Sequence, residues 1–181
     1  MFKHKDQRIG VFVDVQNMYY SSRNLYEKHV NFGIILESAV KGRQLIRAIS
    51  YVIKADNQEE QKFFGALDKL GFEVRQKDLQ TYLSGTKKGD WDVGIAIDAI
   101  IMAPKLDVVT LVTGDGDFTP LVNYLSYMGV IVEIVGFGAT TSNRLLDSAD
   151  DFVDLEQDLD RYLIERVAKR ETNVSGDHLN N

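Results

Sequence analysis

Apolar runs alternate along most of the chain with segments whose apolar residues recur at helical spacing. Continuous apolar runs bounded by glycine or charge are typical of strands buried in a parallel sheet, whereas a 3.6-residue period predicts amphipathic helices. The pattern predicts strands over residues 8–14, 45–53, 72–79, 108–113, 130–135 and 152–153. It predicts helices over residues 16–28, 34–41, 58–70, 90–102, 119–127 and 142–148, and a closing helix with an apolar stripe from Leu155 to Val167. This order predicts an α/β fold, a three-layer α/β/α sandwich around a mainly parallel sheet.

The chain length of 181 residues fits one domain with a substantial core. We expect this domain to cover residues 1–171, and the polar residues 172–181 to form a disordered tail. The chain has no cysteine, which excludes disulfides, zinc thiolates and a cysteine nucleophile. Its three histidines are far apart and lack ligand spacing, which argues against a histidine-based zinc site.

The formal net charge of −6 argues against a passive nucleic-acid coat, which would normally be basic. It is compatible with an enzyme that reaches phosphates through metal ions. No apolar run reaches membrane-spanning length, and the first six residues do not resemble a signal peptide. We therefore expect a soluble, cytoplasmic protein without a membrane partner.

Acidic residues follow two of the predicted strands. Asp14 ends the first strand, and Asp115 and Asp117 come directly after the apolar run 108–112. Right-handed crossovers bring the carboxyl ends of parallel strands to one edge of the sheet, where such sheets bind ligands. Carboxylates gathered there repel one another unless a cation or a proton intervenes. These acids therefore predict a divalent metal site, against the simpler interpretations of a helix cap at Asp14 and a turn at 115–117.

A second acidic segment opens the predicted helix 90–102. Asp90 is expected to cap this helix, and Asp92 lies in the first turn, where the helix dipole favours a carboxylate. Asp98 stands among apolar residues, so it is expected to be partly buried and to need a partner, either in the core or in a site. Lys88, just before the helix, is a candidate phosphate contact or simply a solvated loop lysine.

Two further polar residues adjoin the predicted edge of the sheet. Asn17 lies three residues after Asp14 and is placed to orient it or a bound water. Ser142 caps the predicted helix 142–148 and is a candidate phosphate ligand at the helix start. It belongs to a glycine-containing segment, 136–143, that resembles a dinucleotide-binding loop only superficially, because Thr141 replaces the last glycine.

Taken in order, these motifs resemble the NYN domain family, a branch of the PIN-like nucleases, and most closely its LabA-like (DUF88) group. The matching motifs are Phe-Val-Asp-Val-Gln-Asn ending at Asn17, Lys-Gly-Asp-Trp-Asp ending at Asp92, Ile97-Asp98, Thr-Gly-Asp-Gly-Asp-Phe ending at Phe118, and Ser142 with Leu145, Ala149, Asp150 and Phe152. They span residues 8–155. The resemblance implies a PIN-like fold and a metal-dependent ribonuclease. By motif position it makes Asp14, Asp92, Asp98, Asp115 and Asp117 the catalytic and metal-holding acids, with Asn17, Lys88 and Ser142 as accessory or phosphate-binding residues.

Ligands that are all oxygen suit Mg²⁺ or Mn²⁺, which would activate water for attack on a phosphodiester of single-stranded or structured RNA. The acidic chain suggests that RNA is gripped locally, with a protein partner or a second copy assisting. One alternative is a non-catalytic RNA-binding or regulatory protein that retains the pocket. Another is a phosphatase of the haloacid dehalogenase type, which needs a second aspartate two residues after Asp14, where this chain has Gln16.

Overall fold

The computed structural model describes residues 3–54, 58–78, 80–81 and 87–165. Within this part of the chain, six parallel strands form one sheet in the order β4-β3-β1-β7-β8-β9. The strands are β1 (Arg8–Asp14), β3 (Gln44–Lys54), β4 (Glu73–Asp78), β7 (Val108–Val112), β8 (Ile131–Gly136) and β9 (Asp151–Asp154). The predicted α/β class and the parallel sheet are confirmed.

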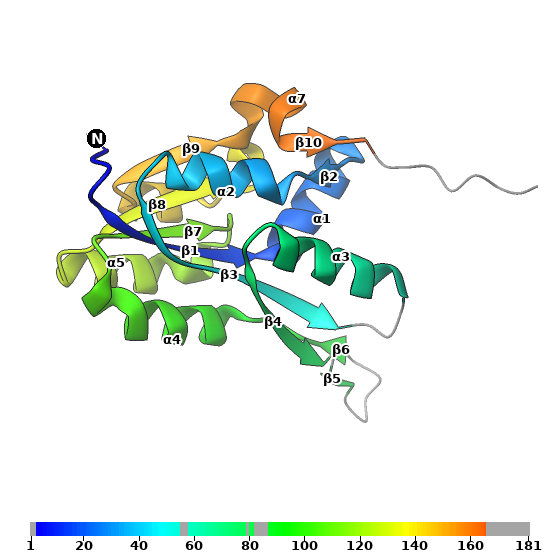
Figure 1. Cartoon of the computed structure of the whole chain (residues 1–181), viewed down its shortest axis with the longest axis horizontal. Helices are drawn as coiled ribbons and strands as arrows, with labels where there is room; N and C mark the ends of the chain where they lie inside the picture. Colours follow the sequence, from blue (N-terminus) through cyan, green and yellow to red (C-terminus); the bar gives the residue numbers. More distant parts are fainter. Residues whose placement is uncertain (1–2, 55–57, 79, 82–86, 166–181) are drawn as a thin grey trace, which may run out of the picture.

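Helices cover both faces of the sheet (Figure 1). One face carries α1 (Val15–Tyr26), α2 (Phe32–Val40) and α3 (Gln58–Lys69). The other carries α4 (Asp92–Met102), α5 (Thr119–Tyr127) and α6 (Asn143–Ser148). The predicted three-layer arrangement is therefore also confirmed, and each of the six helices lies within a few residues of its predicted range.

The alternation of side chains along the central strand explains the two cores. In β1, Ile9, Val11 and Val13 belong to the core beneath α1–α3, whereas Phe12 belongs to the core beneath α4–α6. Successive strand residues point to opposite faces, so a strand covered on both sides is apolar along most of its length. This burial on both sides is what made β1 and β7 recognisable as largely apolar runs.

The strand order creates one position where a ligand is expected. Counted along the chain, the six strands run 3-2-1-4-5-6, so the connections leave β1 and β7 in opposite directions. In such doubly wound sheets the ligand crevice lies outside the carboxyl ends of the strands at this point of reversal. Asp14 ends β1, and the 113–118 segment follows β7, so the predicted acids flank that crevice.

The predicted closing helix is the main error in the sequence-based assignment. The chain instead forms η4 (Leu155–Asp158), a single helical turn α7 (Leu159–Tyr162) and the short strand β10 (Leu163–Ile164). β10 pairs antiparallel with β2 (His29–Val30). Leu155, Tyr162 and Leu163 are buried and Leu159 is half-buried. Leu163, however, reaches the core as part of a strand, which local periodicity does not reveal. Val167 and the predicted tail 172–181 lie outside the described residues, so the predicted domain limits stay a prediction.

Smaller elements complete the described chain: β5 (Gln80–Thr81), which pairs with β6 (Lys87–Lys88), and the 3-10 turns η1 (Ala103–Lys105), η2 (Gly116–Phe118) and η3 (Gly138–Thr140). Among the described residues, no helix is both long enough and apolar enough to span a bilayer.

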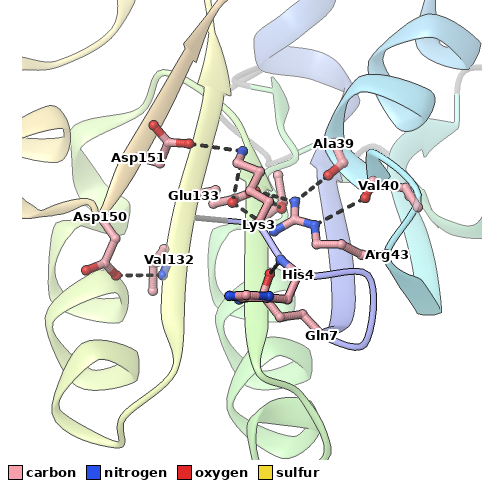
Figure 2. A network of polar contacts seen from close by, with 11 residues as sticks. Lys3, His4, Gln7, Ala39, Val40, Arg43, Val132, Glu133, Asp150 and Asp151 are labelled. Carbon is pink, nitrogen blue, oxygen red and sulfur yellow. Dashed lines mark hydrogen bonds and ion pairs between the residues drawn. The ribbon is translucent and has the colours of Figure 1, made fainter. Parts of the chain in front are cut away.

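A buried ionic network ties Lys3, near the start of the chain, to the sheet (Figure 2). Arg43 and Glu133 are 5% and 1% exposed, and the Arg43 Nη2 lies 2.7 Å from Glu133 Oε2. Lys3 Nζ lies 3.0 Å from a carboxylate oxygen of both Glu133 and Asp151. Burial alone would raise the pKa of Glu133, but Arg43 and Lys3 outweigh burial and hold it below its ordinary value. The network therefore keeps a charged group inside the core.

Candidate metal centre

Asp14 stands where β1 passes directly into α1. It is the N-cap of α1, and its Oδ1 accepts a hydrogen bond from the backbone N–H of Asn17 at 3.1 Å. The cap predicted for Asp14 is therefore present. Only 9% of the residue is exposed, so the carboxylate is nearly buried at the end of β1, beside β7.

Thr113 connects Asp14 to the segment that follows β7. Its hydroxyl is buried and donates to Asp14 Oδ2 at 3.5 Å, and it accepts the backbone N–H of Asp115 at 3.2 Å. A single hydroxyl thus fixes the relative positions of two predicted site acids.

Asn17 makes a second link across the same crevice. Its side-chain Oδ1 accepts the backbone N–H of Gly114 at 2.9 Å. The predicted orientation of Asp14 by Asn17 therefore comes from the Asn17 backbone, while its side chain clamps the loop after β7. A Cβ on Gly114 would lie 3.0 Å from the carbonyl oxygen of Thr140, so glycine lets this loop approach its neighbour closely.

The turn η2 presents the next two acids. Asp115 Oδ1 accepts the backbone N–H of Asp117 at 2.9 Å, so the local Asp-Gly turn weighed in the sequence analysis is present. This turn directs both carboxylates out of the sheet edge, with Asp115 half-buried and Asp117 exposed. A carboxylate that forms a turn retains oxygen lone pairs for a metal, so the turn and the metal interpretations are compatible.

Trp91 positions the fourth acid, Asp92, at the first residue of α4. The indole Nε1 donates to the carbonyl oxygen of Val52 at 2.9 Å, and the ring packs on Tyr51 with centroids 5.3 Å apart. Both partners belong to β3, so the start of α4 is anchored to the carboxyl end of that strand. Trp91 occupies the N-cap without a side-chain cap hydrogen bond, so the prediction that Asp90 caps this helix is wrong.

Three carboxylates converge at this edge: Asp92, Asp115 and Asp117 each offer one oxygen, and these oxygens lie within 4.8 Å of one another. Asp14 lies close enough for the charges of Asp92 and Asp115 to act on it. Burial is the largest cause that raises the pKa of Asp14 to about 6; the two charges add to it, while hydrogen bonds from Asn17 and Thr113 oppose it. Such mutual destabilisation of ionised groups is what a divalent cation relieves.

Asp98 is placed differently from the other predicted acids. It lies six residues after Asp92 on α4 and is not part of the converging group. Its Oδ2 accepts the hydroxyl of Tyr51 at 2.8 Å and lies 3.6 Å from Arg75 Nε. Burial, followed by this hydrogen bond, raises the pKa of Tyr51, so the phenol stays protonated as the donor. The partner expected for a partly buried Asp98 is therefore a tyrosine of β3.

Ser142 lies against the turn that carries the acids. It is the N-cap of α6, as predicted, although its side chain makes no capping hydrogen bond. Its backbone N–H donates to the carbonyl oxygen of Gly114 at 3.0 Å. A Cβ on Gly116 would lie 2.7 Å from Ser142 Oγ, so the serine packs directly on η2.

Four successive amides of the segment 136–143 are already bonded within the protein and are not free to bind a dinucleotide. The N–H groups of Gly138 and Ala139 donate to the carboxylates of Asp154 and Glu156, at 3.1 and 2.8 Å. Those of Thr140 and Thr141 donate to the carbonyl oxygen of Phe137, both at 3.0 Å. The loop is thus closed by the protein's own acceptors, which explains why its likeness to a nucleotide-binding loop is superficial.

An apolar groove of about 390 Å³ adjoins the acids between α4 and α5. Asp92 and Asp117 line it together with Ala96, Ile100 and Tyr124. Lys88 lies in β6, where it is the backbone partner of Gln80, and its side chain is outside the described part of the structure.

Sequence reasoning assigned no role to Thr113 or Trp91. Thr113 carried a usable signal, because it is a hydroxyl residue placed between a largely apolar strand and Gly114. Trp91 is the one tryptophan in the chain and stands between Asp90 and Asp92, but its partner Val52 is distant in sequence and gives no local signal.

Comparison with known proteins agrees with this arrangement. The family model of the NYN domain matches residues 8–156. The chain belongs to the NYN domain family. It is 25% identical over 186 residues to the low amplitude and bright protein LabA of Synechococcus elongatus. The aligned region covers 94% of this chain and 95% of LabA. It is also similar to the crystal structure of a protein of unknown function from Vibrio parahaemolyticus, with a TM-score of 0.82 and 36% identity over 91% of this chain and 100% of that one.

The NYN match begins with β1 and ends within η4, so it includes every acid of the converging group. The family resemblance inferred from short motifs is thereby confirmed over most of the described chain. Because the Vibrio protein has no assigned function, its likeness supports the NYN fold rather than an activity.

Proposed function

We propose that this NYN domain is a metal-dependent ribonuclease that hydrolyses phosphodiester bonds with Mg²⁺ or Mn²⁺. One observation supports this most strongly: the oxygens of Asp92, Asp115 and Asp117 converge within 4.8 Å beside the buried Asp14, at the point of reversal of the sheet. All four donors are hard oxygens, the ligand type that these two ions prefer.

The residues present fit such an ion. Asp14, Asp92, Asp115 and Asp117 would hold it, and when bound it would supply a Lewis acid and a water of lowered pKa. Asp14 provides a buried anchor, whereas Asp117 is exposed at the rim and is placed to face the substrate. Thr113 and Asn17 hold the end of β1 and the loop after β7 together through the hydrogen bonds described above.

The remaining predicted site residues receive distinct roles in this proposal. Asp98 acts as a positioning residue, because it fixes α4 to β3 through Tyr51. Ser142 packs against Gly116 of η2 and borders the space that a phosphate would occupy. The phosphate contact proposed for Lys88 rests on the motif resemblance alone.

RNA is the proposed substrate because of the NYN membership and the shape of the surroundings. The groove between α4 and α5 starts at Asp92 and Asp117 and has an apolar lining. It offers room for an unpaired nucleoside beside a phosphate bound at the acids.

Cleavage of labelled RNA tests this proposal. The wild-type protein should cut single-stranded or structured RNA in Mn²⁺ or Mg²⁺ but not in excess chelator. Asp117→Asn should abolish cleavage without unfolding, because the amide keeps the size of the side chain and removes the charge that attracts the ion. The matched control is Asp68→Asn, an exposed aspartate on α3, which should cleave like the wild type.

Failure has two separate outcomes. Absence of cleavage on varied RNAs in Mn²⁺ would favour a non-catalytic RNA-binding or regulatory protein that retains the pocket. Cleavage that survives both Asp14→Asn and Asp117→Asn would assign the activity to other residues or to a contaminant. Thermal melts separate metal binding from catalysis, since an ion bound only to the native state raises the melting temperature, and Asp115→Asn should reduce that rise.

A further inference from the structure

Two basic residues flank the acidic group along the carboxyl edge of the sheet. The strand order β4-β3-β1-β7-β8 sets Lys77 of β4 at one end of this edge and Arg144 of α6, which follows β8, at the other. Between them lie Asp14 at the end of β1 and the acids Asp115 and Asp117 after β7. The edge therefore carries negative charge in its middle and a positive charge on either side.

The register of the sheet brings Lys77 to the level of the acids. Lys77 is paired with Ile53, which lies two residues beyond Tyr51, and Tyr51 is the partner of Asp14. At roughly 3.3 Å per residue, Lys77 lies about 7 Å past Asp14 in the direction in which the strands end. The chain leaves β7 toward Asp115 in the same direction.

Contacts with the start of α4 hold the ammonium of Lys77 in place. Its Nζ donates to the carbonyl oxygen of Asp90 at 3.0 Å and lies 5.7 Å from the centre of the Trp91 ring. The next residue is Asp92, a member of the converging group. An ammonium has three N–H donors and the contact with Asp90 uses one of them, so Lys77 can also donate to a phosphate oxygen.

Arg144 is exposed in the first turn of α6, next to the turn that carries Asp115 and Asp117. Ser142, two residues earlier, packs on Gly116 of that turn. Helix dipoles disfavour a cation in a first turn, and this one contains no acid to offset it. Within the described residues Arg144 forms no ion pair, hydrogen bond or ring contact, whereas other arginines there pair with carboxylates: Arg8, Arg43, Arg47 and Arg75. Its guanidinium is therefore available to a ligand.

We propose that a single strand of RNA crosses this edge from Lys77 to Arg144, with one phosphate bound at each and the phosphate to be cleaved held at the acids between them. The proposal rests on the ribonuclease function proposed above, which makes RNA the ligand. Four strand spacings separate β4 from β8, or about 19 Å, a span that suits a site for roughly four or more nucleotides of a single strand. A guanidinium binds phosphate through two parallel hydrogen bonds, and an ammonium binds it as a point charge.

The charge of the whole chain makes such local contacts necessary. With a formal net charge of −6, the protein as a whole repels a polyanion. An ion held by the acids attracts the phosphate beside it, but the flanking phosphates would meet carboxylates unless a basic side chain stood on each side. Lys77 and Arg144 meet this need on opposite sides of the acids.

The salt dependence of RNA processing tests the proposal. The kcat/KM for a labelled single-stranded RNA is measured in Mn²⁺ between about 50 and 200 mM KCl, where each phosphate contact contributes about 0.7 to the slope of log affinity against log salt. Lys77→Gln and Arg144→Gln should each lower the magnitude of this slope by about 0.7 and reduce kcat/KM about fivefold at about 0.1 M salt. Lys77→Arg and Arg144→Lys, which keep the charge, should retain the wild-type slope.

Lys105→Gln is the matched control. Lys105 is exposed in η1, just before β7 and so at the opposite edge of the sheet, and its loss should leave the slope unchanged. Thermal melts address a purely structural role of Lys77. If Lys77→Gln melts at a lower temperature but keeps the wild-type slope, Lys77 only supports α4 and the proposal is overturned.

The remaining outcomes separate this proposal from the ribonuclease function. Cleavage with unchanged slopes in both glutamine variants, or an equal loss in Lys105→Gln, would overturn the RNA path and leave the ribonuclease function intact. If the wild type does not cleave, the anisotropy of the same uncut RNA gives the slopes directly. Slopes that fall as expected would then support the path without the activity, whereas a wild type that does not bind single-stranded RNA would overturn both.

Discussion

Replacing Asp14 with asparagine should stabilise the metal-free protein at neutral pH, although it removes a proposed metal ligand. Burial, together with the charges of Asp92 and Asp115, raises the pKa of this carboxyl from 3.8 to about 6 in the native state. The native state therefore prefers the neutral form, and its ionisation costs stability as the pH rises from about 4 to above 6. A pKa difference of this size corresponds to about 3 kcal/mol.

The asparagine keeps an oxygen that can accept the N–H of Asn17, and it carries no charge at any pH. Urea unfolding in excess chelator should therefore give Asp14→Asn a gain that is near zero at pH 4 and approaches about 3 kcal/mol at pH 7.5. Asp68→Asn, at an exposed position on α3, is the matched control for the substitution. A gain that is equal at both pH values, or a variant less stable than the wild type at pH 7.5, would refute the reasoning. With the expected result, a variant that is more stable but cannot cleave RNA would identify Asp14 as a residue kept for function at the expense of stability.

Two further predictions concern packing. Gly116→Ala should destabilise the protein by roughly 1–3 kcal/mol in urea unfolding, because the added Cβ would lie 2.7 Å from Ser142 Oγ. Gly65→Ala is the control, because a Cβ at this position in α3 has nothing within 4 Å. It should instead stabilise the protein by roughly 0.5–1 kcal/mol. Equal effects would mean that η2 has room to move. Glu133→Gln should cost roughly 3–5 kcal/mol, because it leaves the buried Arg43 without its carboxylate. Asp107→Asn, opposite the exposed Arg8, is the matched control, and a loss as large there in thermal melts would contradict this assignment.

The sequence predicted an element correctly where the local pattern of apolar residues reflects how that element is buried in the folded protein. The strands buried on both faces, such as β1 and β7, appear as largely apolar runs because both of their faces lie in the core. The prediction of a closing helix after Leu155 was wrong for the opposite reason. The burial of this segment was predicted correctly, but Leu163 and Ile164 pair with His29 and Val30, more than 130 residues earlier, and no local pattern records such a contact.

The same distinction applies to the site. The positions of Asp14, Asp115 and Asp117 at one edge follow from the rule that parallel strands share their carboxyl edge. The linking contacts do not follow from it, because the bonds of Thr113 to Asp14 and of Asn17 to Gly114 join residues 99 and 97 positions apart. Asp98 illustrates the remaining difficulty: the sequence indicated that it needs a partner, but only the structure identifies that partner as Tyr51.

The position of the acids at the reversal of the sheet also sets the time at which they can meet during synthesis. Asp14 and Asp92 leave the ribosome before β7, and Asp115 and Asp117 come after it, so the group is completed by the last of its members to emerge. At a typical rate of synthesis, the interval between Asp14 and Asp117 lasts roughly 5–20 s. Throughout that interval the nascent chain holds an incomplete set of ligands. If the site cleaves RNA, the nascent chain is therefore inert during that interval toward the message from which it is being translated.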